Sequence, residues 1–248
     1  MRLFGLIGYP LTHSFSKGYF AEKFEREGIS DCRYDNYPLE HIDQFPGLIT
    51  GNSQLAGLNV TIPYKKQVIA YLDELDTEAD RVGAVNTVAF RNQAGITRLK
   101  GYNTDVYGFR ESIAPYARPH FKKALVLGTG GSSKAVAYVL EGMGMEVTFV
   151  SRSPAGSNQI SYAAIDRQMI QQNQVVVNAS PVGMYPKTNE FPDIPYEFIT
   201  PGHVLFDLIY NPAETVFMAR GRIRGATVIN GLSMLYLQAE RSWTIWND

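Results

Sequence analysis

Three segments of the chain carry the residue types that acid-base chemistry and phosphate binding require. Asn-Val-Thr-Ile-Pro-Tyr-Lys occupies residues 59–65, and Gly-Tyr-Asn-Thr-Asp occupies residues 101–105. Gly-Thr-Gly-Gly-Ser-Ser-Lys follows an apolar stretch and occupies residues 128–134. The first segment supplies a lysine, the second a carboxylate, and the third a glycine-rich turn that suits a nucleotide. Together they predict an enzyme that transfers hydride to or from a small polyhydroxylated acid.

The lysine and the carboxylate gain significance only as a pair. Alternation along the first segment places Asn59 and Thr61 on one face of a strand end, and Pro63 stops the strand. Lys65 then opens a predicted helix, where the helix dipole disfavours a cation, although such lysines are usually just solvated. Asp105 lies at the predicted start of another helix, where simple capping is the ordinary alternative. We expect Lys65 and Asp105 to act together.

Two serines near the start of the chain add hydroxyl groups to this set. Ser14 and Ser16 lie on a loop just before a predicted helix, with Phe15 between them. If Phe15 packs inward, both hydroxyls can face a ligand, and two hydroxyls suit a carboxylate. The alternative is that Ser16 only caps the helix, which is a common role for serine.

The glycine-rich turn has the sequence context of a dinucleotide site. A predicted strand at 122–128 precedes it and a predicted helix at 131–142 follows it. Gly128 and Gly130 permit the tight turn and the close approach of a pyrophosphate to the helix start. Ser133 stands where the usual fingerprint has its third glycine, and a glycine-rich connection without a ligand is the alternative. No Gly-Lys-Ser/Thr closes the run, which excludes a Walker A loop.

The following predicted strand, at 146–150, indicates which dinucleotide is bound. Arg152 comes after that strand, where an NAD enzyme usually has an acidic residue for the ribose. A guanidinium at this place can stack on adenine and pair with a 2′-phosphate, so NADP is favoured over NAD. A solvated loop arginine is the alternative.

These segments must be positioned by two successive runs of strands and helices. The first run has predicted strands at 2–8, 33–37 and 55–61, with helices predicted at 40–49 and 64–72. It ends in a predicted hairpin around residues 92–95, so the first sheet is expected to be mainly parallel with one antiparallel edge. The second run has continuous apolar strands, which are typical of a parallel sheet covered on both faces. The spacing does not tell which run the last predicted helix, 232–246, packs against.

The composition excludes several classes of protein. A length of 248 residues suits two modest domains, and no apolar run approaches the roughly 20 residues that span a bilayer. A net charge of −1 without a basic run predicts no binding of nucleic acid or membrane. The single cysteine, Cys32, the absence of zinc-like histidine spacing and the lack of an export signal predict a cytoplasmic, metal-free protein.

Taken in order, the motifs resemble the shikimate dehydrogenase family. That family has a Ser-x-Ser loop after a histidine, an Asn-Val-Thr-x-Pro-x-Lys strand end, an Asn-Thr pair, a Gly-x-Asn-Thr-Asp segment and a Gly-x-Gly-Gly turn. All five occur in this chain. The likeness continues through the segments that begin at Asn178, Asp207 and Gly231, so it covers nearly the whole sequence.

The resemblance implies an α/β fold with an N-terminal, mainly parallel substrate domain, a Rossmann-type NADP domain and a cleft between them. It places the substrate domain at 1–104, rejoined by the helix 232–248, and the cofactor domain at 105–231. Lys65 is implied as the general acid/base and Asp105 as the group that orients it. The implied substrate ligands are Ser14, Ser16, Asn59, Thr61, Asn86, Tyr210 and Gln238. The implied cofactor contacts are Gly128, Gly130, Gly131, Ser132, Ser151, Arg152, Ser153, Ser180, Leu208, Gly231 and Met234.

The activity that the resemblance implies is the reversible reduction of 3-dehydroshikimate to shikimate by NADPH, a step of chorismate and aromatic amino acid biosynthesis. The second basic residue that the family usually has shortly after Arg152 is missing from residues 153–156, which predicts reduced NADP selectivity. A quinate/shikimate dehydrogenase that accepts NAD and a non-catalytic shikimate or NADP binder are the alternatives. The expected partners are the small substrate and NADP(H), and the expected assembly is a monomer or a homodimer.

Overall fold

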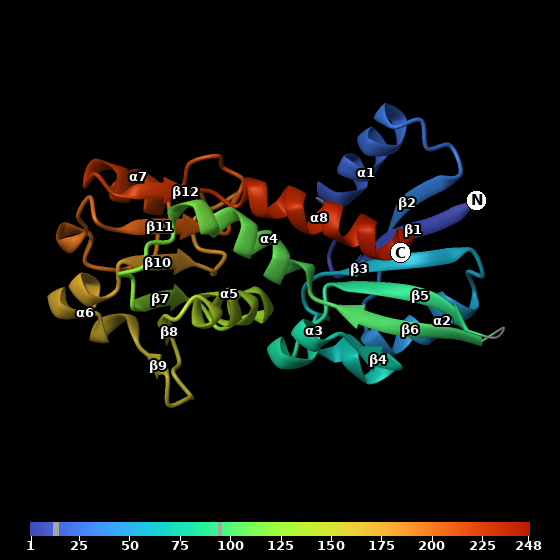
Figure 1. Cartoon of the computed structure of the whole chain (residues 1–248), viewed down its shortest axis with the longest axis horizontal. Helices are drawn as coiled ribbons and strands as arrows, with labels where there is room; N and C mark the ends of the chain where they lie inside the picture. Colours follow the sequence, from blue (N-terminus) through green and yellow to red (C-terminus); the bar gives the residue numbers. More distant parts are fainter. Residues whose placement is uncertain (12–14, 94–95) are drawn as a thin grey trace. The chain divides into compact units, whose positions relative to one another are not determined.

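The chain divides into two compact units, each built around its own six-stranded sheet (Figure 1). The computed structural model describes residues 1–11, 15–93 and 96–248. The first unit comprises Met1–Thr104 with Ala239–Asp248, and the second comprises Asp105–Gln238. Helix α8 (Leu232–Asn247) therefore has residues in both units, whereas the domain boundary expected from the sequence lies before this helix. Among the described residues, no helix has the length and apolar character needed to cross a bilayer.

The sheet of the first unit has the strand order β2-β1-β3-β5-β6-β4. Its strands are β1 (Arg2–Gly8), β2 (Cys32–Pro38), β3 (Leu55–Val60), β4 (Glu74–Leu75), β5 (Thr87–Gln93) and β6 (Ile96–Tyr102). Only β5 among the described strands runs against its neighbours, so the prediction of a mainly parallel sheet is confirmed. The prediction of an antiparallel edge is wrong, because β5 lies inside the sheet and both edge strands are parallel to their neighbours. Strands β5 and β6 form the predicted hairpin, and the residues expected at its tip, 94 and 95, lie outside the described residues.

Helices cover this first sheet on both faces. They are α1 (Phe15–Arg26), α2 (Phe45–Thr50), α3 (Thr77–Val82), the short 3-10 helices at Ile42–Gln44 and Gln67–Tyr71, and the end of α8. One face buries Phe4 and Phe20 with Trp246 of α8, and the opposite face buries Ile7 and Phe45. Alternate residues of β1 therefore serve opposite layers, as the period of a strand requires.

The prediction of a helix at 64–72 is wrong in type and extent. The segment forms a turn followed by the 3-10 helix Gln67–Tyr71. Asp73 explains the early end, because its N–H donates to the carbonyl of Leu99 at 2.9 Å and its carboxylate accepts from the Leu99 N–H at 2.7 Å. The chain is thus bound back to β6 after fewer than two turns.

The sheet of the second unit is wholly parallel and has the strand order β12-β11-β10-β7-β8-β9. Its strands are β7 (Lys123–Leu127), β8 (Glu146–Val150), β9 (Gln159–Ile160), β10 (Val175–Asn178), β11 (Val204–Asp207) and β12 (Thr227–Ile229). In chain order this is the 3-2-1-4-5-6 arrangement of dinucleotide-binding sheets, which place a ligand beyond the carboxyl ends of their strands.

The helices of the second unit are α4, which begins at the last residue of the first unit (Thr104–Ile113), α5 (Gly131–Gly142), α6 (Arg167–Gln172), α7 (Val216–Ile223) and the first part of α8. Short 3-10 helices lie at Ala114–Tyr116, Tyr162–Ala164 and Tyr196–Phe198. Helix α5 contacts β7 and β8, and α7 contacts β11 and β12. Leu125, Val176 and Leu205 of the central strands are fully buried, which agrees with the prediction of strands covered on both faces.

Candidate active site

The turn that carries Lys65 is fixed by its main chain. The N–H of Thr61 donates to the carbonyl of Ile7 at 2.9 Å, which ties the end of β3 to β1. The N–H of Tyr64 donates to the Thr61 carbonyl at 2.9 Å, and the N–H of Val85 donates to the Lys65 carbonyl at 2.7 Å. The side chains of Thr61 and Lys65 are only partly buried. The lysine is therefore held between β1 and the approach to β5.

Asn59 is the centre of a buried hydrogen-bond network rather than a surface group. Its side chain is 5% exposed, and its Oδ1 accepts from the Tyr34 hydroxyl at 2.8 Å. Its Nδ2 lies 3.0 Å from Ser242 Oγ, 3.2 Å from Thr87 Oγ1 and 3.3 Å from the carbonyl oxygen of Asn86. The amide thus has internal partners at both its oxygen and its nitrogen.

The same network reaches the residue that precedes Asp105. The N–H of Thr104 donates to Oδ1 of Asn86 at 2.7 Å, and the Thr104 hydroxyl lies 3.2 Å from the same oxygen. Asp105 follows in the first turn of α4, where the helix dipole favours a carboxylate, and its side chain is 6% exposed. Oδ2 of Asp105 accepts from the Ser132 hydroxyl at 3.3 Å. One expected catalytic residue and one expected cofactor residue are thus in contact.

The two serines of the expected carboxylate site can be described only in part. Ser14 lies outside the described residues. Ser16 is in the first turn of α1, and its side chain is partly buried. Burial raises the pKa of the Tyr34 phenol, and a hydrogen bond with the Ser16 hydroxyl opposes that rise. Ser16 is therefore next to Tyr34, which binds Asn59.

The glycine turn after β7 fits the pyrophosphate of a dinucleotide. Gly128 has φ of +121°, which favours glycine, and a Cβ there would lie 3.0 Å from the carbonyl oxygen of Ala179. A Cβ built on Gly130, the N-cap of α5, meets no atom of the described chain within 4 Å. Ser133 is fully buried and donates to the Gly130 carbonyl at 2.7 Å. A serine thus replaces the third glycine of the fingerprint without filling the open approach to the helix start.

Arg152 lies in the exposed loop that follows β8. The Ser151 hydroxyl accepts from the N–H of Ser153 at 3.1 Å, which shapes this loop. Burial raises the pKa of the Tyr162 phenol, and the nearby positive charge of Arg152 opposes that rise. The guanidinium is therefore close to Tyr162 and retains an exposed position from which it can meet an anion.

Asn178 and Asp207, at the ends of β10 and β11, organise the neighbouring loops. Asn178 Nδ2 donates to Asp207 Oδ1 at 3.0 Å, and Asn178 Oδ1 accepts from the Ser180 hydroxyl at 2.7 Å. The Thr215 hydroxyl donates to Asp207 Oδ2 at 2.6 Å, and the N–H of Ile209 donates to Oδ1 at 3.0 Å. Asp207 is fully buried, and burial raises its pKa to about 6 despite these hydrogen bonds.

Further expected site residues lie on the segments that follow β11 and β12. The N–H of Leu208 donates to the Asn178 carbonyl at 2.9 Å. A Cβ on Gly231 would collide with the carbonyl oxygen of Leu208, so only glycine permits this approach. Tyr210 is partly buried, and burial raises the pKa of its phenol. The side chain of Met234 is 7% exposed, and the amide of Gln238 donates to the Leu235 carbonyl at 2.8 Å.

Known proteins share both the sequence and this fold. The family model for the shikimate dehydrogenase substrate binding domain matches residues 6–88. A curated relative from Carboxydothermus hydrogenoformans, shikimate dehydrogenase (NADP(+)), is 36% identical over 99% of this chain and 91% of its own length.

The chain belongs to the shikimate dehydrogenase family.

Two solved structures extend this relation to three dimensions. Shikimate dehydrogenase 1 from Peptoclostridium difficile is 35% identical, with a TM-score of 0.84 over 100% of this chain and 92% of that one. Shikimate 5-dehydrogenase from Thermus thermophilus, solved with NADP(H) and shikimate, is 30% identical, with a TM-score of 0.84 over 99% of this chain and 93% of that one. The family resemblance and the α/β fold class predicted from the sequence are both confirmed.

Several buried residues of this shikimate dehydrogenase family member were missed as parts of the site. Ser242 lies on the buried face of α8 together with Ala239 and Trp246, at helical spacing. A polar residue on such an apolar face is the signal that could have pointed to it. Asn178 and Asp207 were recognised only as parts of family motifs, because their partners lie 29 positions apart in the sequence.

Proposed function

We propose that this chain catalyses the reversible, NADP-dependent interconversion of 3-dehydroshikimate and shikimate. The observation that carries the proposal is the extent of the family relation, which covers 99% of the chain and therefore includes both compact units. The reaction belongs to the biosynthesis of aromatic amino acids. The relatives that match over this length bear the name shikimate dehydrogenase (NADP(+)).

Lys65 is proposed as the general acid and base. When bound, NADPH supplies the hydride that converts the substrate ketone into an alcohol. Lys65 gives a proton to the oxygen as negative charge develops there, and it takes the proton back in the reverse direction. The hydrogen bond from Val85 to the Lys65 carbonyl supports this role, because it fixes the main chain from which the ammonium group extends.

Asp105 is proposed to orient Lys65 and the reacting hydroxyl. Support comes from the series of contacts in the first unit. The Lys65 carbonyl accepts a hydrogen bond from the N–H of Val85, and the residue after Val85 is Asn86. The Asn86 side chain accepts a hydrogen bond from the N–H of Thr104, which directly precedes Asp105. The start of α4 favours the ionised carboxylate that this role requires.

The substrate's carboxylate and hydroxyls are assigned to the other polar residues of the family motifs. We assign direct contacts to Ser14, Ser16, Thr61, Asn86, Tyr210 and Gln238. Asn59 receives a different role from the one that the resemblance implies, because its amide is engaged by buried neighbours. We propose that Asn59 holds Asn86 and Thr87 in place instead of binding substrate.

NADP(H) is assigned to the carboxyl edge of the second sheet. Gly128, Gly130, Gly131 and Ser132 are proposed to hold the pyrophosphate, as the open approach at Gly130 suggests. Arg152, with Ser151 and Ser153, is proposed to hold the 2′-phosphate. The remaining cofactor contacts are assigned to Ser180, Leu208, Gly231 and Met234.

The cellular location and the oligomeric state are proposed from the sequence. A single cysteine and metal-free chemistry suit the reducing cytoplasm. We expect a monomer or a homodimer, and light scattering on the purified protein at assay concentration tests this expectation. A larger assembly would contradict it.

Initial rates test the proposed activity most simply. Shikimate and quinate are each assayed with NADP+ and with NAD+, and kcat/KM is compared across the four pairs. We expect the highest value for shikimate with NADP+. A higher value for quinate or for NAD+ would favour a quinate/shikimate dehydrogenase, for which the missing second basic residue after Arg152 is the supporting observation. Absence of turnover with all four pairs would contradict an enzymatic role.

A further inference from the structure

Helices α1 and α8 meet in the first unit along a row of aromatic side chains. The rings of Phe24 and Trp243 are 5.3 Å apart, and those of Phe20 and Trp246 are 5.6 Å apart. Burying these rings stabilises the contact through apolar area, and the ring pairs favour particular orientations. Polar bonds between the two helices add a further constraint on their register.

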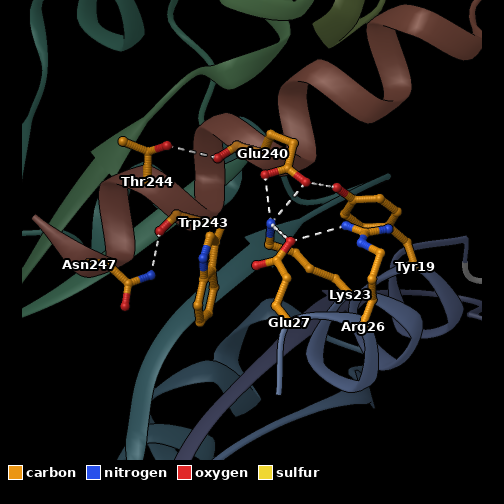
Figure 2. Close-up of polar contacts among 8 residues, drawn as sticks. All are labelled: Tyr19, Lys23, Arg26, Glu27, Glu240, Trp243, Thr244 and Asn247. Atoms are coloured by element: carbon orange, nitrogen blue, oxygen red, sulfur yellow. Dashed lines mark hydrogen bonds and ion pairs between the residues drawn. The ribbon is translucent and has the colours of Figure 1, made fainter. Parts of the chain in front are cut away.

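A charged cluster lies near Trp243 of this row, as Figure 2 shows. The Lys23 ammonium donates to Oε2 of Glu240 at 2.9 Å and to Oε1 of Glu27 at 2.9 Å. The Tyr19 hydroxyl donates to the carboxylate of Glu240 as well. Lys23 itself is only 4% exposed. We call Tyr19, Lys23 and Glu240 the α1–α8 pin, because these three residues connect the two helices through directional bonds.

The pin joins a buried lysine to a carboxylate whose side chain is 42% exposed. Lysine is almost never fully buried unless it is paired, because a buried charge is costly. Burial by itself would lower the pKa of Lys23, but the hydrogen bonds that its ammonium donates to Glu240 and Glu27 outweigh that effect and raise the pKa, so the side chain stays charged. Ion pairs with a partly exposed partner usually contribute little to stability, and apolar residues of similar volume often stabilise a buried position as well. We therefore attribute the pin to the arrangement that it specifies.

The arrangement that the pin specifies includes a proposed substrate ligand. Ser16, Tyr19 and Lys23 follow one another at helical spacing, so they lie on one face of α1. On α8, Ser242 comes two residues after Glu240 and enters the network around Asn59. The end of α8 therefore joins the helix of Ser16 to the network that holds Asn86 and Thr104. A slip of one helical turn, about 5.4 Å, would separate Lys23 from Glu240 and displace Ser16 relative to that network.

We propose that Glu240, acting through Tyr19 and Lys23, is a positioning residue that sets where Ser16 presents its hydroxyl to the substrate carboxylate. This inference rests on the proposed function. It concerns substrate binding only, because the pin lies wholly in the first unit, whereas the proposed cofactor contacts lie in the second.

The test compares four variants with the wild-type enzyme. Glu240→Ala removes the acceptor of the pin, and Tyr19→Phe removes one of its bonds. The double variant Lys23→Met with Glu240→Leu replaces the pin by apolar side chains and leaves no buried charge behind. Glu27→Gln is the matched control, because Glu27 also binds Lys23 but directly follows α1, and its hydrogen bonds and ion pairs are with Lys23 and Arg26 of α1.

The expected result is a selective loss of substrate affinity. KM for shikimate should rise about tenfold in Glu240→Ala and in the double variant, with kcat and KM for NADP+ within about twofold of wild type. Tyr19→Phe should give a smaller rise, and Glu27→Gln should give none. Thermal unfolding is measured in parallel, and the double variant should be at least as stable as Glu240→Ala. If Glu240→Ala does not fold, the double variant and Tyr19→Phe decide the matter.

Two results would overturn the inference. One is a folded double variant whose KM for shikimate equals that of the wild type, since the pin would then not position Ser16. The other is a rise in KM for shikimate in Glu27→Gln that is as large as the rise in Glu240→Ala, since the bond between the helices would then not matter. Failure of the proposed function is recognised separately, because the wild-type enzyme itself would then show no turnover with shikimate and NADP+.

Discussion

Lys65 is the residue on which the proposed chemistry depends most. Replacing it by methionine keeps the length of the side chain and removes the proton that the substrate oxygen requires. We expect Lys65→Met to lower kcat by roughly 10² to 10⁴, the usual contribution of a general acid or base, while KM for shikimate changes little. Steady-state rates with NADP+ and shikimate measure this. A variant with nearly normal kcat would remove Lys65 from the chemical step.

Arg152 should decide which nicotinamide cofactor is preferred. Its exposed guanidinium is the proposed partner of the 2′-phosphate, which NADPH has and NADH lacks. We expect Arg152→Ala to raise KM for NADPH by about tenfold or more and to leave KM for NADH nearly unchanged. Arg118→Ala, which removes another exposed arginine of the same unit, is the control and should affect neither constant. Equal effects of Arg152→Ala on both cofactors would contradict the assignment.

Single residues show how far sequence reasoning reaches. The alternation that predicted Asn59 on a polar strand face was informative, yet it could not reveal that Tyr34, Thr87 and Ser242 would engage its amide. All three partners lie 25 or more positions from Asn59 in the sequence. Local patterns report which face a side chain occupies, whereas its hydrogen-bond partners depend on the tertiary fold.

At the level of elements, the ends of β10 and β11 are joined by a buried carboxyl group, that of Asp207, whose protonation should affect stability. Burial raises the pKa of Asp207 to about 6, although bonds from Thr215, Ile209 and Asn178 oppose the rise. In the unfolded chain an aspartate has a pKa of about 3.9, so the folded protein binds this proton more tightly. Between about pH 4 and pH 6, the contribution of Asp207 to the free energy of unfolding therefore falls as the pH rises, by at most about 1.4 kcal/mol per pH unit.

Replacing Asp207 by asparagine should remove this pH dependence, because the amide does not titrate. We expect the free energy of unfolding of the wild type, relative to that of Asp207→Asn, to increase as the pH is lowered from about 7 to about 4. Urea unfolding of both proteins at several pH values measures the difference. A difference that stays constant with pH, or that decreases as the pH is lowered, would contradict a raised pKa.

Elements with strong local signals were predicted well. Helix α5 and strand β8 have the predicted bounds, because a glycine turn and a continuous apolar run mark their ends. The segment after Pro63 was predicted poorly, because its helical pattern competes with the hydrogen bonds between Asp73 and Leu99 of β6. Short elements such as α3 and β9 were missed, since a few residues give too little periodicity to recognise.

At the scale of the whole molecule, the chain passes between the two units at Thr104–Asp105 and at Gln238–Ala239. Both positions lie within helices, α4 and α8, and each adjoins a proposed site residue. Residue spacing alone did not assign the last helix to either run of elements. The reason is that this helix, α8, has residues in both units. Residue types at a strand end and a helix start, and then the family motifs, pointed to Lys65 and Asp105 as partners although 40 positions separate them in the sequence.

The central claim is that Lys65 and Asp105 act as one catalytic group, and a double-mutant cycle tests it most directly. We measure kcat for shikimate oxidation by NADP+ in the wild type, Lys65→Met, Asp105→Asn and the double variant. If the two residues serve the same proton transfer, the double variant should lose about as much activity as Lys65→Met alone. A loss equal to the product of the two single losses would mean that the residues act independently and would contradict the claim.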